Sequence, residues 1–331
     1  MVRHTSFEAS LMRVMDTAPV NDGITSWQVA AINTDGDLLA AIERGPTLDP
    51  KDPTNYFETL SFTKPWIAHA HTLHPDSPPL TTLMQLEAND RTPGDGILQF
   101  YPEGYEISLA NVASLALRIS DNTAQRMWVR ALGGPEVVNG IVLGHSPVKE
   151  AFKLTKLEPK PNDSHSLDDS RQPFYCGITN AREVCTLFNQ VVKDPIWRDH
   201  LSHGSIDYGL RRFIEPLGRK PNKQWSTEPM LQAYLELRGF NQWPDNIAEK
   251  RHAAVLSELL RFQDPITVFP NKVGTDGACG EYHDVVYLPK INGSDIILAT
   301  LCRNHPERDN ESSGNKAYLV HAQLGRAALY S

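Results

Sequence analysis

A hairpin pattern near each end of the chain, with a long helical stretch between, most limits the folds open to it. Residues 25–43 place two strand-like runs on either side of a turn sequence at 34–37. Residues 282–303 repeat this pattern around the Asn-Gly pair at 292–293. We therefore predict one antiparallel sheet built from both ends of the chain.

The middle of the chain, from residue 61 to about residue 264, has mostly helical periodicity. A short amphipathic helix is also expected over residues 6–17, and another helix at the C-terminus. This order predicts an α+β fold, an α/β sandwich with an inserted all-α domain. We expect the α/β domain over residues 1–60 and 266–331, and the helical domain over residues 61–265.

The composition favours a soluble globular protein whose partner is a small molecule. Hydrophobic residues make up 40% and charged residues 22% of the 331 residues, and no run of 18 apolar residues occurs. The formal net charge of −8 argues against nucleic acid or an anionic membrane as the main partner. We expect a monomer that spans no membrane.

The N-terminus lacks the apolar segment of a signal peptide. The protein is therefore expected to be cytoplasmic if Met1 is the native start, and periplasmic or secreted if a leader has been removed.

The four cysteines are far apart and form no C-x-x-C pair, so neither a zinc site nor a disulfide scaffold is expected. Buried free thiols are the simplest expectation, although a single Cys176–Cys185 or Cys279–Cys302 bridge stays open. We expect no metal and no cofactor.

The sequence ETLSFTKPWIAHA, residues 58–70, places Ser61 and Lys64 three residues apart at the start of an apolar helix. At that spacing the hydroxyl and the amine share one face of a helix. An isolated S-x-x-K occurs by chance in many helices, and an isolated serine at this position is usually an N-cap.

Three further stretches contain residues of catalytic type. They are Ser120-Asp121-Asn122 between two helices, Glu158 and Asn162 in a long loop, and Lys272 and Gly274 at the start of a strand. Taken singly, each has an ordinary explanation: helix capping, a solvated carboxylate or a surface lysine.

In this order, the four stretches resemble the active-site set of class A serine β-lactamases. The resemblance extends to GDGILQFYPEGYEISLANVASLALRISDN, to the GGPE that follows, and to KVGTDG followed by HDVVYL, and it covers roughly residues 25–330. It implies the β-lactamase/transpeptidase-like fold, a penicillin-binding site and a link to antibiotic resistance.

The resemblance implies that Ser61 is a nucleophile that forms an acyl-enzyme. Either Lys64 or a water held by Glu158 takes its proton, and we leave both bases open. Ser120 then relays a proton to the leaving nitrogen. Glu158, helped by Asn162, activates the water that hydrolyses the acyl-enzyme.

The same resemblance implies that Asn122, Lys272, Gly274, Thr275 and His283 bind the substrate. Three features depart from the family pattern. The loop from Asp163 to Gly177 differs from the usual spacing, which bears on the fit of Glu158. The other two lie in and near the K-x-G motif. Val273 replaces the usual Thr or Ser inside K-x-G, and His283 stands near the place of a common arginine. These departures concern the identity of the substrate more than the reaction class.

Three functions follow. The leading one is a class A β-lactamase-like serine hydrolase that opens a β-lactam or similar cyclic amide. The second is a related esterase or D-alanyl-D-alanine peptidase, and the third is a non-catalytic binding protein of the same fold. Glu158 favours the first, because related penicillin-binding proteins usually lack this glutamate.

Overall fold

The structure is a computed structural model. It describes residues 6–17, 24–45, 57–158, 177–203, 270–276, 281–291, 294–304 and, except for 322 and 326, residues 320–328. Two compact units are present, and each is described by itself. One consists of Met1–Pro46 with His203–Ser331, and the other of Thr47–Ser202. The domain boundary expected at residue 265 lies outside the described residues.

The first unit is built on an antiparallel sheet to which both chain ends contribute. Strand β1 pairs with β10, with Trp27 opposite Cys302 and Val29 opposite Thr300. The prediction of one sheet from both ends is therefore confirmed. The order is β2-β1-β10-β9-β8-β7, with bounds β1 (Ile24–Asn33), β2 (Leu38–Arg44), β7 (Ser202–His203), β8 (Pro270–Asp276), β9 (Glu281–Ile291) and β10 (Ser294–Asn304).

The first hairpin closes through a turn that needs a glycine. The Gly36 amide donates to the Asn33 carbonyl at 3.0 Å, and Gly36 has φ 99°. A side chain at this φ is strained. The Asn33 amide oxygen also accepts from the Asp37 backbone at 2.8 Å, so polar residues on both sides of the glycine fix the hairpin.

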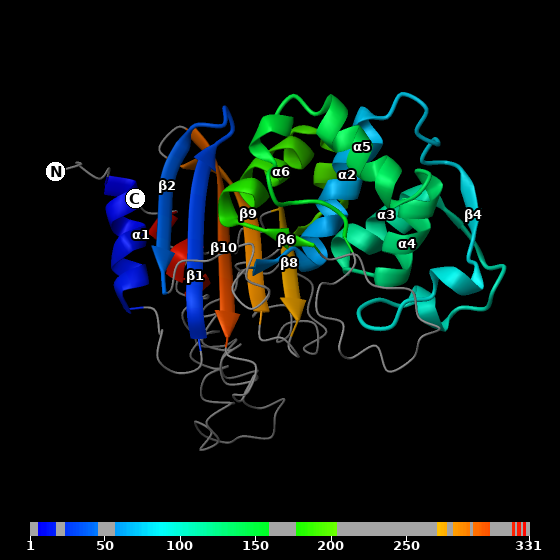
Figure 1. The fold of residues 1–331 in the computed structure, drawn as a ribbon, viewed down its shortest axis with the longest axis horizontal. Helices are drawn as coiled ribbons and strands as arrows, with labels where there is room; N and C mark the ends of the chain where they lie inside the picture. Colours follow the sequence, from blue (N-terminus) through cyan, green and yellow to red (C-terminus); the bar gives the residue numbers. More distant parts are fainter. Residues whose placement is uncertain are drawn as a thin grey trace, which may run out of the picture. The chain divides into compact units, whose positions relative to one another are not determined.

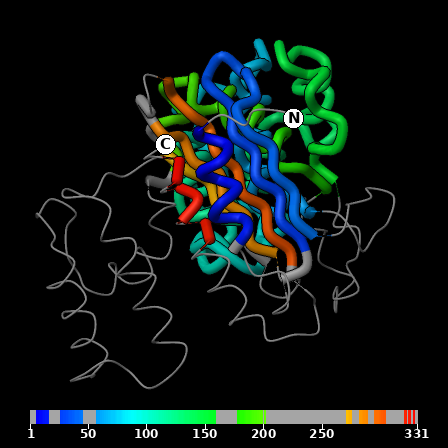
Figure 2. Tube along the Cα trace, turned by 90° about the vertical axis from the view of Figure 1, so that its left-hand side faces the viewer, coloured from blue at the N-terminus to red at the C-terminus, as the bar shows by residue number. Residues whose placement is uncertain are grey.

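One face of the sheet is covered by helices from both ends of the chain. Helix α1 (Ser6–Thr17) and the helical residues within 320–328 lie side by side across the strands (Figures 1 and 2). Their apolar residues, among them Leu11, Met15 and Leu324, share a buried core with alternate strand residues such as Trp27 and Val29. The apolar residues of the strands, which alternate, and those of the helices, which recur at helical spacing, pack together in this core.

The second unit is mostly helical. The Ser108 hydroxyl caps α3 by accepting from the Asn111 amide at 3.4 Å. Gly133 and Gly134, at φ 92° and 106°, follow the end of α4, and Pro135 begins the next helix. The helices are α2 (Thr63–Leu73), α3 (Leu109–Arg118), α4 (Asn122–Ala131), α5 (Pro135–His145), α6 (Ala181–Lys193) and α7 (Pro195–His200).

Helix α2 is the central helix of this unit. Residues Thr63 to Ala70 are all buried, which is typical of a helix surrounded by others. The described residues of this unit also form two small sheets, β3 (Phe57–Glu58) with β6 (Ile178–Thr179) and β4 (Leu83–Gln85) with β5 (Glu106–Ser108). The same residues include the 3-10 turns η1 (Leu60–Phe62), η2 (Ala88–Asp90), η3 (Leu98–Phe100) and η4 (Lys149–Ala151).

Two of the cysteines are described, and both are buried free thiols. Cys185 and Cys302 form no disulfide, so neither of the two bridges left open by the sequence is present. Burial raises the pKa of the Cys302 thiol well above its usual value, which makes it a poor nucleophile. Within the described residues, no helix is long and apolar enough to cross a bilayer.

Candidate active site

The candidate active site is a hydrogen-bonded cluster around the Lys64 ammonium, inside the helical unit. Lys64 is fully buried. Its Nζ donates to Ser61 Oγ at 2.9 Å, to Ser120 Oγ at 3.1 Å and to Asn122 Oδ1 at 2.9 Å. A buried amine needs such partners, because an unpaired charge away from water is costly. Four of the residues predicted from the sequence are therefore brought together.

Ser61 lies on a 3-10 turn just before α2. The preceding residue, Leu60, has φ 48°, and the turn passes directly into Thr63 and the helix. The two-strand sheet β3–β6 holds the entry to this turn, since the Thr59 amide donates to the Gly177 carbonyl at 3.0 Å. Ser61 is therefore not an N-cap, and its hydroxyl faces other side chains.

Helix α2 tolerates a proline beside the lysine because of its position. Pro65 is the third residue of the helix, in the first turn, where a backbone N–H has no intrahelical acceptor. The apolar residues Trp66 and Ile67 then anchor this turn in the core. Lys64 is thereby held on the same face as Ser61, as the three-residue spacing predicts.

Ser120 is held in a left-handed conformation. Its φ is 63°, which is unfavourable for a residue with a Cβ and is often found at functional sites. This geometry brings Ser120 Oγ to 2.6 Å from Ser61 Oγ. One hydroxyl therefore donates to the other.

The buried Asp121 carboxylate fixes the loop that carries Ser120 and Asn122. One oxygen accepts from the Ala124 amide at 2.9 Å and so caps α4. The other accepts from the amides of Ile97 and Leu98 at 2.7 and 2.9 Å. Three amide donors stabilise a buried carboxylate, and they tie the 97–98 segment to the loop of residues 120–122.

Gly96 makes this close approach possible. It has φ 111°, and a Cβ at this position would lie 2.2 Å from Asp121 Cγ. Asn122 contacts the same segment, since its backbone amide donates to Asp95 O at 3.0 Å and its side-chain amide to Pro93 O at 3.3 Å. The stretch GDGI of the sequence is therefore the support of the Ser-Asp-Asn loop, a role that motif spacing did not reveal.

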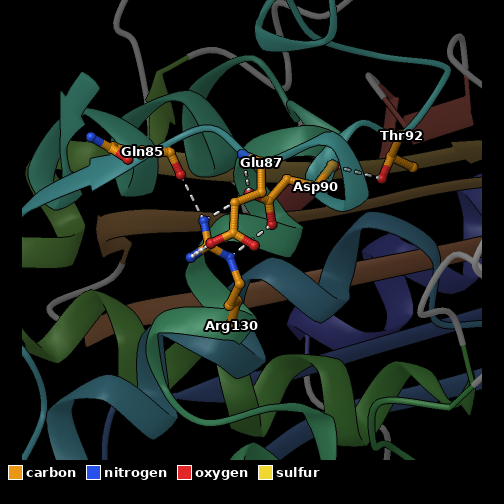
Figure 3. Close-up of polar contacts among 5 residues, drawn as sticks. All are labelled: Gln85, Glu87, Asp90, Thr92 and Arg130. Carbon is orange, nitrogen blue, oxygen red and sulfur yellow. Dashed lines mark hydrogen bonds and ion pairs between the residues drawn. The ribbon is translucent and has the colours of Figure 1, made fainter. Parts of the chain in front are cut away.

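An arginine on α4 anchors the other end of this supporting segment (Figure 3). The Arg130 guanidinium contacts both oxygens of the buried Asp90 at 3.0 and 2.7 Å, and it also donates to Gln85 O at 2.8 Å. It forms an ion pair with Glu87 at 2.7 Å. The hydrogen bond to Asp90 raises the pKa of Arg130 further.

Glu158 lies at the end of the described part of its loop. Its side chain is 39% exposed and forms an ion pair with Lys156 Nζ at 2.5 Å. Gly177, at φ 68°, packs against this stretch, since a Cβ there would lie 2.4 Å from Lys156 O. Asn162, the predicted partner of Glu158, lies outside the described residues. The deacylation role of both residues stays a prediction.

The remaining predicted residues belong to the sheet unit. Lys272 and Gly274 lie on β8, with Gly274 opposite His283 of β9, and Thr275 follows on the same strand. Lys272 is buried, and its Nζ donates to Val273 O at 2.8 Å. Their part in substrate binding stays a prediction.

His283 has a defined set of partners within the sheet unit. It is fully buried; its Nδ1 accepts from the Cys302 amide at 3.3 Å, and its Nε2 lies 2.9 Å from the buried Glu281 carboxylate. Because Nδ1 accepts, the ring proton resides on Nε2 and is donated to Glu281. The sequence analysis missed Glu281, which the alternation of β9 did not single out.

The comparisons with known proteins concern the family and the fold. Residues 50–208 match the model of the β-lactamase enzyme family, a segment that contains Ser61, Lys64, Ser120, Asn122 and Glu158. No curated protein matches the chain in sequence. The family resemblance predicted from the sequence is confirmed.

The fold is that of solved β-lactamases and PBP-A. A β-lactamase from Sphaerobacter thermophilus DSM 20745 is 17% identical, with TM-score 0.54, covering 99% of this chain and 97% of that one. A class A β-lactamase representative from Bacteroides cellulosilyticus DSM 14838 is 15% identical, with TM-score 0.56 and full coverage, 100%, of both chains. A PBP-A variant in an acyl-enzyme complex with penicillin G is 15% identical, with TM-score 0.55, covering 98% and 99%. The predicted fold class is confirmed.

Proposed function

We propose that this chain, with a β-lactamase-family segment in a β-lactamase/transpeptidase-like fold, is a serine hydrolase that opens a β-lactam or similar cyclic amide. The observation that carries the proposal is the cluster of Ser61, Ser120 and Asn122 around Lys64 Nζ, with contacts of 2.9 to 3.1 Å. A nucleophile within reach of a base, which is itself oriented by further groups, is the arrangement of acyl-serine enzymes.

Acylation begins with attack of Ser61 Oγ on the amide carbon. Its proton goes to Lys64, if the amine is neutral when substrate is bound, or through a water to Glu158. Ser120, whose oxygen lies 2.6 Å from Ser61 Oγ, returns a proton to the leaving nitrogen. The C–N bond breaks, and an ester to Ser61 remains.

Deacylation needs a water and a base that activates it. We assign this base to Glu158, with Asn162 holding the same water. The water adds to the ester carbonyl, the C–O bond to Ser61 breaks, and the proton taken by Glu158 returns to the serine oxygen.

Substrate recognition is assigned residue by residue from the family resemblance. Asn122, already fixed by Lys64, offers its side-chain amide to the substrate. From the family resemblance we assign Lys272 and Thr275 to a substrate carboxylate, and the backbone from Thr275 onward to a second oxyanion donor. His283, near the place of the family's common arginine, is likewise assigned to substrate binding.

The test is covalent labelling by penicillin, followed by intact-mass measurement. The wild-type chain should gain the mass of one penicillin, and Ser61→Ala should gain none while keeping its fold. The matched control is Ser146→Ala, because Ser146 is a buried serine of the same unit whose hydroxyl contacts His69 instead. Labelling of Ser61→Ala would show that another residue is the nucleophile.

A related esterase or D-alanyl-D-alanine peptidase is the second candidate. It is favoured by the ion pair of Glu158 with Lys156, which engages the carboxylate at a half-exposed position. Turnover of a chromogenic cephalosporin separates the two candidates. A labelled chain that does not turn over the cephalosporin but cleaves a simple ester would support the second.

A further inference from the structure

A cleft of about 420 Å³ lies within the helical unit, between η3, β5 and α3. Its volume falls within the range of small-molecule sites. Every residue that lines it belongs to the described part of this unit. The apolar part of the lining includes Leu83 and Ile97, which are 66% and 45% exposed. These two side chains give the cleft an exposed apolar edge.

Three lining residues hold Asp121 through their backbones. The amides of Ile97 and Leu98 donate to its carboxylate at 2.7 and 2.9 Å, and the Asp121 amide donates to Leu115 O at 3.1 Å. Asp121 lies between Ser120 and Asn122, both of which contact Lys64 Nζ. The wall of the cleft and the catalytic cluster therefore share one loop.

The polar lining favours a cation. Two tyrosines of the lining, Tyr101 and Tyr105, have ring centroids 4.5 Å apart and planes tilted by 46°. Among the lining residues, Glu106 alone carries a charge. The neighbouring Arg91 guanidinium is engaged with the Tyr101 carbonyl at 2.9 Å. Aromatic faces and a carboxylate together attract an ammonium group, while the apolar residues accept its hydrocarbon body.

We propose that this cleft binds a small organic cation with an apolar body, such as an arylalkyl ammonium compound. Its occupancy restrains the 97–98 segment and, through Asp121, the position of Ser120 and Asn122. The site is separate from the proposed substrate contacts and does not depend on the hydrolase activity.

Binding is tested with phenethylammonium and hydrocinnamate, which share a phenylethyl body and carry opposite charges. The full-length Ser61→Ala chain is used, so that catalysis plays no part. Calorimetric titration should show saturable binding of the cation at least about tenfold tighter than that of the anion. Glu106→Gln should weaken cation binding about fivefold, and Glu103→Gln, an exposed acid nearby that does not line the cleft, should not. Equal binding of the two probes, or equal effects of the two substitutions, would contradict the proposal that this cleft binds an organic cation.

The coupling is tested by amide hydrogen exchange in the same Ser61→Ala chain. Saturating phenethylammonium should slow exchange of the Ile97 and Leu98 amides, which donate to Asp121. Exchange in α6, which contributes no residue to the cleft, should not change. Cation binding without slower exchange at 97 and 98 would leave the site standing and overturn the link to the catalytic loop.

Discussion

Ser61 Oγ and Ser120 Oγ lie 2.6 Å apart, and both accept from the Lys64 ammonium. This contact exists because Ser120 takes the left-handed conformation, φ 63°, at a cost of roughly 1 kcal/mol. The hydrogen bonds that hold Asp121 and Asn122 to residues 93–98 offset this cost. The contact between Ser61 and Ser120 therefore depends on the backbone of residues 93–98, which lies outside the four motifs.

Gly96→Ala is predicted to impair acylation of Ser61. The new Cβ would lie 2.2 Å from Asp121 Cγ, so Asp121 must shift and move Ser120 and Asn122 with it. We expect the acylation rate to fall at least about tenfold, because small misplacements of reacting groups cost that much or more. The measurement is stopped-flow acylation by penicillin.

Gly104→Ala is the matched control for this prediction. Gly104 also has positive φ, 81°, but a Cβ there would meet nothing within 4 Å. Both substitutions carry the backbone strain of alanine at positive φ, and the Gly96 variant alone carries the clash. Equal acylation rates in the two variants would contradict the support assigned to Gly96.

Arg130→Ala is predicted to destabilise the helical unit. It leaves the Asp90 carboxylate, which is 3% exposed, without its charge partner (Figure 3). Because the Arg130 side chain is 37% exposed, solvent screens the pair, and its loss should cost about 1 to 2 kcal/mol. The free energy of unfolding, measured in urea, should fall by this order in Arg130→Ala and by less than about 0.5 kcal/mol in Lys153→Ala, whose side chain is 70% exposed.

Asp90→Asn combined with Arg130→Ala separates the charge from the packing. If the unpaired carboxylate causes the loss, the double variant should be more stable than Arg130→Ala alone. A double variant that is less stable would show that the arginine acts by packing or through Glu87 and Gln85.

The sequence predicted the members of the catalytic cluster but not what supports them. Ser61 and Lys64 follow from a three-residue spacing within one helical turn, which is local information. The contact of Asp121 with Ile97 and Leu98 spans more than twenty positions, and no periodicity encodes it. The Ser-Asp-Asn stretch combines a helix cap with the contacts of the candidate site, since Asp121 caps α4 while its two neighbours contact Lys64.

The fold could be predicted from the sequence because the information that specifies it is local. Alternation in β1, β9 and β10 and the apolar stripe of α1 all report one shared core, so local patterns agree with the tertiary structure. Ser120 could not be predicted to have positive φ, because an isolated serine prefers other conformations and only the surrounding contacts reverse this preference.

His69 is predicted to make the helical unit less stable in mild acid. Burial lowers the pKa of His69 to about 4, below the usual value of about 6.5 in the unfolded chain. Between these values the unfolded chain binds a proton at His69 while the folded chain does not. The contribution of neutral His69 to the free energy of unfolding is therefore fully present above pH 6.5 and falls as the pH drops toward 4. Urea unfolding at several pH values measures this slope. His69→Gln, which can keep a contact with Ser146, should flatten it, and an unchanged slope would assign the effect to other groups.

Lys272→Ala is predicted to weaken recognition of a substrate carboxylate. The KM for a penicillin should rise about tenfold or more, because one charged contact is lost, whereas Lys149→Ala, at an exposed turn of the helical unit, should leave KM unchanged. Comparison with the methyl ester of the same penicillin isolates the contact. If Lys272→Ala impairs acid and ester equally, Lys272 does not bind the carboxylate.

Glu158→Ala is predicted to separate acylation from deacylation. If Glu158 activates the hydrolytic water, the variant should still be labelled on Ser61, while release of product should slow roughly 10²- to 10⁴-fold. The acyl-enzyme would accumulate, so a burst of product would be followed by near-arrest. Rapid-quench mixing with intact-mass detection follows both steps.

Lys156→Ala tests the role of the Glu158 carboxylate by removing its ion-pair partner. Lys156 Nζ holds Glu158 at 2.5 Å, and both side chains are about two-fifths exposed, 44% and 39%, so the ion pair contributes at most about 1 kcal/mol to stability. Its loss should leave the fold intact and free Glu158 to act as a base. We expect deacylation to be slow in Glu158→Ala and unchanged or faster in Lys156→Ala. This pair of results would identify Glu158 as the base that activates the hydrolytic water. Equal deacylation in the wild type and in both variants would remove Glu158 from the mechanism and favour the esterase or peptidase.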